Sequence, residues 1–347
     1  MEWYNPNTRN LPWKQTNDAY KIWLSEVILQ QTRVEQGMPY YKIFIQHYPT
    51  VRHLAAAPLD DVLKLWEGLG YYSRARNLHK AAQQIVLLHK GNFPNDYAAI
   101  LALSGIGSYT AAAIASFAFQ LPYAVLDGNV FRVLSRVFGI ATPIDTPKGK
   151  KQFAILAQQI LDKKHPDIHN QAIMDLGALV CKPRQPLCNQ CPFSTACKAL
   201  EKDLITKLPV KINKIVKANR FFKYYIIYDN QFVYIQKREN EDIWKGLYEF
   251  PYIETTNEIS EIEHKIQTKE QSTLNNYIKK LHAEYTPYCY TQTLSHQHIK
   301  GSFYEIKLKS LLSPPKGWLC IAKTALKEYA FPKIIRSYLE DRLNYLS

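Results

Sequence analysis

The sequence lacks a long apolar segment. In its 347 residues no apolar run reaches the roughly 18 residues that a membrane-spanning helix needs. Its beginning, MEWYNPNTRNLPW, has no basic start followed by an apolar stretch, so it is not typical of a secretory signal peptide. These two absences predict a soluble, cytoplasmic protein without a membrane partner. Reducing compartments disfavour disulfides, so the six cysteines need another explanation.

Acidic side chains are also in short supply. The chain has 30 Asp and Glu against 44 Lys and Arg, which gives a formal net charge of +14 at pH 7. This excess favours a polyanionic partner, either nucleic acid or an anionic membrane surface, although a merely basic soluble protein carries similar charge. Hydrophobic residues make up 46% of the chain, enough to build cores for two or more domains.

No internal repeat or low-complexity tract is present, and the residue pattern changes once. Up to about residue 200 apolar residues recur at helical spacing, as in DAYKIWLSEVILQQTRVEQGMPYYKIFIQHYP. Between residues 198 and 223, eight basic and two acidic residues predict a solvated connector. Beyond it the pattern is mixed, with FFKYYIIYDNQFVYIQK as two strands around a turn, EIEHKIQTKEQSTLNNYIKKL as a helix, GSFYEIKLKSL as a strand and TALKEYAFPKIIRSYLEDRLNYL as largely helix.

Four of the six cysteines lie in CKPRQPLCNQCPFSTAC with the spacing C-x6-C-x2-C-x5-C; they are Cys181, Cys188, Cys191 and Cys197. Four thiolates this close together can surround one metal centre, either tetrahedral zinc or a [4Fe–4S] cluster. The spacing alone does not separate these two centres. Cys289 and Cys320 stand apart, and we expect them to be buried free thiols.

The stretch LSGIGSYTAAAIA predicts a turn between two helices. Gly105 and Gly107 allow the backbone to bend and expose N–H groups at the start of the second helix, an arrangement that suits a phosphate. Leu103 and Ile106 can anchor the turn. A tight turn without a ligand is the alternative. With an alanine-rich helix after it, the pattern favours a helix-hairpin-helix DNA-binding element.

Two carboxylates have a possible chemical role. Glu26 has Ile22, Trp23 and Leu29 as helical neighbours, so burial among them would raise its pKa and keep it able to donate a proton. Asp127 precedes an apolar helical run, and it suits either a helix N-cap or a second carboxylate for glycosidic bond cleavage. An exposed Glu26 on an amphipathic helix is the simpler alternative.

Several motifs in order carry a family resemblance. LPWK, SEVILQQTRV, LWEGLGYYSRARNLHKAA, LSGIGSYTAAAI, LDGNVFRVLSR, NQAIMDLGALVC and the cysteine cluster resemble the helix-hairpin-helix, Gly/Pro…Asp superfamily of base-excision DNA glycosylases. Within it they are most similar to the MutY family of adenine DNA glycosylases. The resemblance implies an all-α glycosylase region over 1–200, with a six-helix core at about 18–130 and an iron–sulfur cluster region from 1–17 and 131–200.

The resemblance also implies individual roles in this region. It makes the four cysteines ligands of a [4Fe–4S] cluster, Glu26 the acid that protonates adenine and later activates water, and Asp127 the carboxylate that stabilises, or covalently traps, the sugar. Tyr109 and Asn129 match polar residues of that catalytic site, and we expect the Tyr109 phenol to donate to Asp127 or to the sugar region. The remaining matches are Gly105, Gly107, Gln31, Tyr71 and Arg74 as DNA-binding residues, and Trp13 and Gln171 near the adenine pocket.

The remainder resembles the C-terminal domain of the same family, which is related to Nudix hydrolases. IWKGLYEFP carries this match, a basic linker over 201–222 precedes the domain, and the domain spans 223–347. The glutamate-rich metal-binding box of Nudix pyrophosphatases is missing after it, so we expect a binding module. Leu294, Ser295 and His296 match a Phe-Ser-His loop that reads 8-oxoguanine. Leucine replaces the phenylalanine, which puts the wedge role of this position in question.

The implied activity is removal of adenine mispaired with 8-oxoguanine or guanine in double-stranded DNA, by a monomer. An endonuclease III-like lyase is the nearest alternative, but those relatives carry a lysine after the hairpin where this chain has Ser108, Tyr109 and Thr110. A non-enzymatic iron–sulfur DNA-binding protein would not need Glu26 and Asp127 together. A Nudix-type nucleotide hydrolase is disfavoured by the missing box.

Overall fold

A computed structural model describes residues 3–4, 9–213, 216–255, 287–311 and 313–346. The chain divides into two compact units, one of residues 1–56 and 77–214 and the other of residues 57–76 and 215–347. The second unit therefore includes residues 57–76, a short segment that lies within the mostly helical first 200 residues of the sequence. None of the described helices combines the length and the apolar composition that a bilayer crossing requires.

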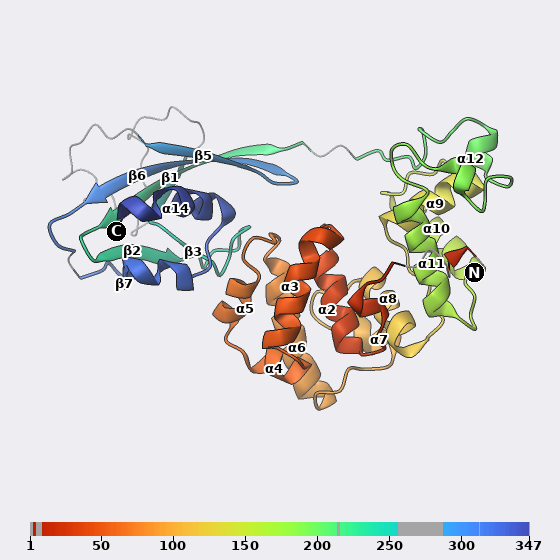
Figure 1. Ribbon diagram of the computed structural model, residues 1–347, viewed down its shortest axis with the longest axis horizontal. Helices are drawn as coiled ribbons and strands as arrows, with labels where there is room; N and C mark the ends of the chain where they lie inside the picture. The colour runs from red at the N-terminus through yellow and green to blue at the C-terminus, as the bar shows by residue number, and fades with distance from the viewer. Residues whose placement is uncertain (1–2, 5–8, 214–215, 256–286, 312, 347) are drawn as a thin grey trace. The chain divides into compact units, whose positions relative to one another are not determined.

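The first unit is helical. Its elements are η1 (Pro12–Lys14), α2 (Ala19–Leu29), α3 (Val34–His47), α4 (Val51–Ala56), most of α6 (Ser73–His89), α7 (Tyr97–Leu101), α8 (Ser108–Phe119), α9 (Gly128–Phe138), α10 (Pro147–Ile160), α11 (Pro166–Leu179), η2 (Cys188–Gln190) and α12 (Lys198–Glu201). Helix α8 contacts α2, α7 and α11, and α11 also contacts α9 (Figure 1). Small side chains let α8 approach its neighbours closely, because residues 110–116 of this helix are Thr, Ala, Ile and Ser and all are buried.

One expected stretch is interrupted. The residues after Asp18 form two helices, α2 and α3, and the chain between them turns at Gln31 with φ of +57°. The apolar periodicity of the two helices runs on across the turn, which is why the sequence pattern did not reveal it. The break leaves Gln31 exposed at the junction.

Over its described residues the second unit is built on a seven-stranded sheet, together with α5 (Leu59–Leu65) and the first turn of α6. Its strands are β1 (Ala218–Tyr228), β2 (Phe232–Lys237), β3 (Tyr248–Glu249), β4 (Tyr252–Thr255), β5 (Tyr288–Thr293), β6 (Gln297–Lys307) and β7 (Trp318–Ala322). The main order is β3-β2-β1-β6-β5, with β4 paired to β1 and β7 to β2. Strands β1 and β6 run parallel, in register from Ala218 opposite Gln297 to Tyr228 opposite Lys307.

Helix α14 (Lys333–Leu346) contacts β5 (Figure 1), and η3 (Lys323–Glu328) precedes it. Tyr338 of α14 stacks on Phe303 of β6 with ring centroids 4.5 Å apart, which places the aromatic core of this unit between helix and sheet. The two strands and the turn expected in FFKYYIIYDNQFVYIQK are confirmed as β1 and β2, and β6 is confirmed as a strand. The helix expected in EIEHKIQTKEQSTLNNYIKKL lies outside the described residues.

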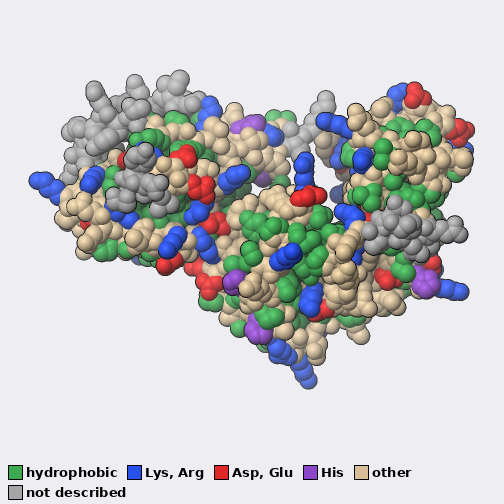
Figure 2. All heavy atoms as spheres, viewed as in Figure 1, with side chains coloured by type: hydrophobic (Ala, Val, Ile, Leu, Met, Phe, Trp, Pro, Cys, Tyr) green, Lys and Arg blue, Asp and Glu red, His purple; other side chains and the backbone are tan. Residues whose placement is uncertain are grey.

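The predicted domain boundaries stay predictions. Within the expected linker 201–222, Leu208 is buried with Cys197 and Ala199, and strand β1 already begins at Ala218. Lys and Arg side chains are spread over the face of each unit drawn in Figure 2.

The expectation that the two lone cysteines are buried is wrong, because Cys289 and Cys320 are both exposed.

Candidate functional site

A cavity of about 210 Å³ in the helical unit brings together six side chains expected at the catalytic centre and the base pocket. They come from distant parts of the sequence and are Trp13, Glu26, Tyr109, Asp127, Asn129 and Gln171. The family resemblance predicted their roles one by one, and the fold now gives them one shared space. The individual roles remain predictions.

Glu26 is buried in α2 with the side chains of Ile22 and Trp23 on the same helix. Burial raises the pKa of Glu26 to about 7, and the nearby charge of Asp127 acts in the same direction. A hydrogen bond from the Tyr109 hydroxyl to Glu26 Oε2, 2.7 Å long, opposes this shift. The exposed alternative for Glu26 is thus wrong, and the carboxyl is able to act as a proton donor near neutral pH.

The hydrogen bond of Tyr109 goes to Glu26, whereas we expected it to go to Asp127 or toward the sugar. Burial, followed by the charges of Glu26 and Asp127, raises the pKa of Tyr109 well above its usual range. The phenol therefore keeps its proton and donates a hydrogen bond to the carboxyl group of Glu26. Sequence position places Tyr109 at the start of α8 but does not show which carboxylate its hydroxyl reaches.

Asp127 is both a helix cap and a member of the cavity. Its side chain caps α9 by accepting a 2.7 Å hydrogen bond from Val130 N, and its other oxygen accepts one of 2.7 Å from Asn129 Nδ2. Burial raises the pKa of Asp127, while these hydrogen bonds act to lower it. The capping alternative and the catalytic one are compatible, because the cap fixes the carboxylate where it lines the cavity.

The sequence reasoning missed an ion cluster at the edge of this cavity. Asp175 of α11 is fully buried and accepts hydrogen bonds from Lys14 Nζ at 2.5 Å and from Arg9 Nε at 2.8 Å. Removing either cation would leave a buried charge poorly compensated, so the three residues fix the N-terminal segment against α11. An aspartate inside the apolar run IMDLGAL was the signal that could have revealed it.

The two residues expected near the base pocket, Trp13 and Gln171, each contact a tyrosine. Trp13 is buried and meets Tyr41 edge to face, with ring centroids 5.1 Å apart. The Tyr4 hydroxyl donates to Gln171 Oε1 at 2.8 Å, which fixes the orientation of that amide. Both expected pocket residues thus have defined partners.

A second residue that sequence reasoning missed connects the cavity to the cysteine segment. Arg132 Nη2 donates to Asn129 Oδ1 at 2.8 Å, and Arg132 Nε donates to the backbone oxygen of Cys181 at 2.6 Å. Since Asn129 in turn donates to Asp127, one guanidinium holds together the carboxylate environment and the first cysteine. A planar donor fork is suited to such a double contact, and a lysine would not replace it.

The four clustered cysteines line one further cavity in the helical unit. Burial, followed by the charges of Cys181 and Cys197, raises the pKa of Cys188, and the charge of Arg136 opposes this shift only in part. Arg136, itself buried, donates to Cys181 Sγ at 3.5 Å and to the backbone oxygen of Lys182 at 2.7 Å. Within the described residues no three metal-binding side chains already meet in metal-binding geometry. The donor set nevertheless fits a thiolate-held centre, whether zinc or iron–sulfur.

The hairpin before α8 has the expected form. Leu103 and Ile106 are buried, and Gly105 has φ of +73°, where an added Cβ would lie 2.5 Å from Asn77 Cβ. Gly107 is the N-cap of α8, and an added Cβ there would meet nothing within 4 Å. Gly105 is therefore required by the turn itself, whereas Gly107 leaves open space above the N-terminus of α8, as the close approach of a phosphate requires.

A third cavity, of about 420 Å³, lies within the other unit, and we name it the reading cavity after the role predicted for its lining loop. It brings together Tyr71 and the predicted 8-oxoguanine loop of Leu294, Ser295 and His296. The loop is the tight turn between β5 and β6, closed by a hydrogen bond from Leu294 N to Gln297 O, and its Ser295 hydroxyl contacts His296 Nδ1 at 3.0 Å. Tyr71 has φ of +48°, and 45% of it is exposed.

Arg74, predicted to bind DNA, is a buried residue. It is only 8% exposed, its Nη2 donates to Gly70 O at 3.1 Å, and its guanidinium lies 5.0 Å from the Trp66 ring. Arg74 thus supports the turn that presents Tyr71, and its direct contact with DNA stays a prediction. Gln31 belongs to the helical unit and Tyr71 to the second unit, and their roles in binding DNA stay predictions.

Comparison with known proteins places these observations in a family. The model of the HhH-GPD superfamily base excision DNA repair protein matches residues 24–165, and that of the NUDIX domain matches residues 223–341. The adenine DNA glycosylase of Buchnera aphidicola subsp. Baizongia pistaciae (strain Bp) is 39% identical over 272 residues, which cover 78% of this chain and 77% of that protein. The adenine DNA glycosylase of Homo sapiens is 43% identical over 211 residues, 58% of this chain and 39% of that protein.

A solved structure of a thermostable thymine-DNA glycosylase aligns with a TM-score of 0.54 at 30% identity, covering 58% of this chain and 93% of that one. The fold agreement therefore concerns the helical half, where the carboxylates and the cysteines lie. Together with a relative that matches along most of both chains, it identifies the protein: the chain belongs to the adenine DNA glycosylase family of the HhH-GPD superfamily, with a C-terminal Nudix-like domain.

Proposed function

We propose that the protein hydrolyses the N-glycosidic bond of adenine mispaired with 8-oxoguanine or guanine in duplex DNA, without cutting the strand. The observation that carries this proposal is the shared cavity in which a buried Glu26 with a pKa of about 7 lies with Asp127. A mispaired base costs less to extrude than a paired one, and extrusion is needed before its glycosidic bond can be reached.

The two carboxyl groups divide the reaction between them. Protonated Glu26 gives its proton to the adenine ring, and the bond between adenine and C1′ of the sugar breaks with its electron pair on the base. The carboxylate of Asp127, held by Val130 N and Asn129, stabilises the positive charge left on the sugar. Water then adds to C1′, and its proton returns to Glu26.

Strand cutting by an amine requires a free nucleophile, and the hairpin offers none. Among the described residues that line the cavity, Lys14 carries an amine. Burial lowers the pKa of Lys14, but its Nζ pairs with Asp175 at 2.5 Å, which opposes that shift and engages the amine as a hydrogen-bond donor. This pairing supports a hydrolytic glycosylase over a Schiff-base lyase. The net charge of +14 and the open space above Gly107 support DNA as the partner.

The four cysteines are proposed to hold a [4Fe–4S] cluster. Bound there, the cluster would tie the 181–197 segment together, and it would take no part in breaking the glycosidic bond. Zinc is the alternative that the donor set equally allows, and iron and acid-labile sulfide analysis separates the two. The monomeric state and the cytoplasmic location belong to the same proposal.

The test is single-turnover adenine release from duplexes with adenine opposite 8-oxoguanine or guanine. We expect free adenine and an abasic strand that stays intact until alkali is added. Borohydride should trap no covalent complex above background. If a complex is trapped in the wild type and disappears in Lys14→Met, the Schiff-base lyase mechanism is correct and the hydrolytic mechanism is wrong.

A further inference from the structure

The reading cavity has three walls, and one of them has no assigned role. The first wall is the 68–76 segment with Tyr71, and the second is the β5–β6 turn with Leu294, Ser295 and His296. The third is formed by Asp242, Ile243 and Trp244, which belong to the loop of residues 238–247 between β2 and β3. This β2–β3 loop contains no helix or strand of its own. Backbone hydrogen bonds from Arg238 N to Leu247 O and from Gly246 N to Arg238 O close its base, and side-chain contacts add to the support of the part that lines the cavity.

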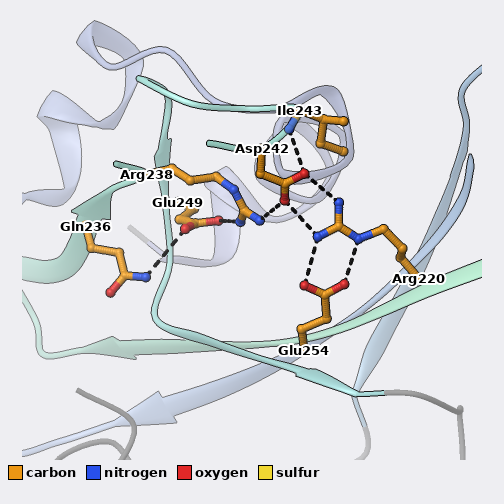
Figure 3. A network of polar contacts seen from close by, with 7 residues as sticks. All are labelled: Arg220, Gln236, Arg238, Asp242, Ile243, Glu249 and Glu254. Atoms are coloured by element: carbon orange, nitrogen blue, oxygen red, sulfur yellow. Dashed lines mark hydrogen bonds and ion pairs between the residues drawn. The ribbon is translucent and has the colours of Figure 1, made fainter. Parts of the chain in front are cut away.

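The carboxylate of Asp242 accepts several of these side-chain contacts. Asp242 accepts from Arg220 through both of its oxygens, at 2.9 and 2.7 Å, and from Arg238 Nη2 at 2.6 Å (Figure 3). The backbone N–H of Ile243 adds a fourth hydrogen bond of 2.7 Å. Partial burial alone would raise the pKa of Asp242, but the bonds from Arg220, Ile243 N and Arg238 outweigh it and hold that pKa well below its usual range.

Both arginines are fixed from the sheet. Arg238 is buried, donates to the buried Glu249 of β3 at 2.6 Å, and lies 4.9 Å from the ring of Tyr252. Arg220 of β1 also holds Glu254 of β4 through hydrogen bonds of 2.6 and 2.8 Å. As Figure 3 shows, Asp242 lies between the two guanidinium groups, so the rigid sheet determines where the β2–β3 loop lies.

The β2–β3 loop also reaches the wall that carries Tyr71. Arg76 Nη1, in the first turn of α6, donates to Lys245 O at 2.8 Å. Trp244 is buried with its ring 5.7 Å from that of Phe222, so the side chain after Ile243 is anchored in the core. A shift of Asp242 would therefore change the width of the cavity and the support of the first wall together.

We propose that Asp242, clamped by Arg220 and Arg238, is a positioning residue that holds the third wall of the reading cavity and thereby sets the preference for 8-oxoguanine over guanine opposite adenine. This inference rests on the proposed function. Guanine and 8-oxoguanine differ only at C8 and N7 of one ring. Selecting between them through hydrogen bonds requires walls that are fixed before the base arrives, because a mobile wall adapts to either base.

The experiment compares Asp242→Asn with Glu254→Gln in the full-length protein. The two substitutions each remove one carboxylate from Arg220, but only Asp242 lines the cavity. The measurement is the ratio of single-turnover adenine release opposite 8-oxoguanine to that opposite guanine. We expect Asp242→Asn to lower the ratio roughly tenfold, as fits the loss of charge-assisted hydrogen bonds. Glu254→Gln should keep the wild-type ratio.

An unchanged ratio in Asp242→Asn, or an equal fall in Glu254→Gln, would overturn the proposal. If Asp242→Asn fails to fold, as shown by loss of release opposite guanine and of its thermal transition, Arg220→Gln decides. It leaves Arg238 on Asp242, and the proposal requires its ratio to fall below that of Glu254→Gln. Failure of the wild type to release adenine from either duplex would instead contradict the proposed function.

Discussion

The Tyr109 hydroxyl donates a 2.7 Å hydrogen bond to Glu26 Oε2, so the neutral phenol and the carboxyl group are directly paired within the cavity. A hydrogen bond donated to a carboxylate favours its charged form and lowers its pKa. Burial sets the pKa of Glu26 at about 7, and Tyr109 keeps it from rising further. This relationship makes the pH dependence of the reaction a direct probe of the site.

Tyr109→Phe should move the alkaline limb of adenine release to higher pH. Glu26 must be protonated to donate, so the rate falls as pH rises through its pKa. Removal of the hydroxyl raises that pKa by about one unit, judged from the strength of hydrogen bonds to charged groups. The check is the single-turnover rate against pH. A limb that stays in place would show that the hydrogen bond does not tune Glu26.

Glu26→Gln should stabilise the protein above pH 7. The folded pKa of Glu26, about 7, exceeds its ordinary value of 4.5, so its stability contribution is full below 4.5 and is lost as pH rises through 7. Glutamine removes this cost of burying a charge, which is up to about 3 kcal/mol from the pKa difference. The measurement is thermal unfolding of both proteins against pH. Equal midpoints above pH 7 would contradict the buried, raised carboxyl.

Arg132→Gln should slow adenine release. The substitution breaks the contact with Asn129, whose amide donates to Asp127, and loosens that carboxylate. We expect a loss of roughly tenfold or more in the single-turnover rate, from misplacement of a reacting group. Arg132→Lys keeps the charge but loses the fork, so it should remain slow. Full activity in both variants would show that Arg132 has no positioning role.

Cys191→Ser should lower the bound metal, whereas Cys320→Ser should not. Cys191 lines the cavity shared by the four clustered cysteines, and Cys320 is an exposed thiol in the other unit. Iron, zinc and acid-labile sulfide measured on the purified proteins give the answer. An iron–sulfur centre predicts iron and sulfide together in the wild type and in Cys320→Ser. Zinc without sulfide would replace the cluster in this account.

The sequence predicted the identity of the site residues better than the contacts between them. Glu26, Asp127 and Gly105 were identified from motifs because their chemical types and local spacing are recognisable in a linear pattern. The partner of Tyr109 was not predictable, because a side chain at the start of α8 can reach either carboxylate until α2 and α9 are packed against it. Burial of Arg74 and the Asp175 cluster likewise depend on contacts between residues far apart in sequence.

The β2–β3 loop shows the same limit in the second unit. Arg220, Arg238 and Asp242 carry no recognisable spacing, and only the pairing of β1, β2, β3 and β4 in one sheet brings their side chains together. The segment 57–76 reads as part of the helical half, yet it lies in the second unit and contributes Tyr71 to the reading cavity. Non-local contacts of this kind leave no periodic signal in the sequence.

The central claim is that a buried, protonated Glu26 starts the removal of adenine. Its most direct test is single-turnover adenine release from a duplex with adenine opposite 8-oxoguanine, measured for the wild type and Glu26→Gln across the pH range around 7. We expect adenine release by the wild type that declines as pH rises through about 7, and none above background by Glu26→Gln. Release by Glu26→Gln at the wild-type rate, or no release by the wild type, would contradict it.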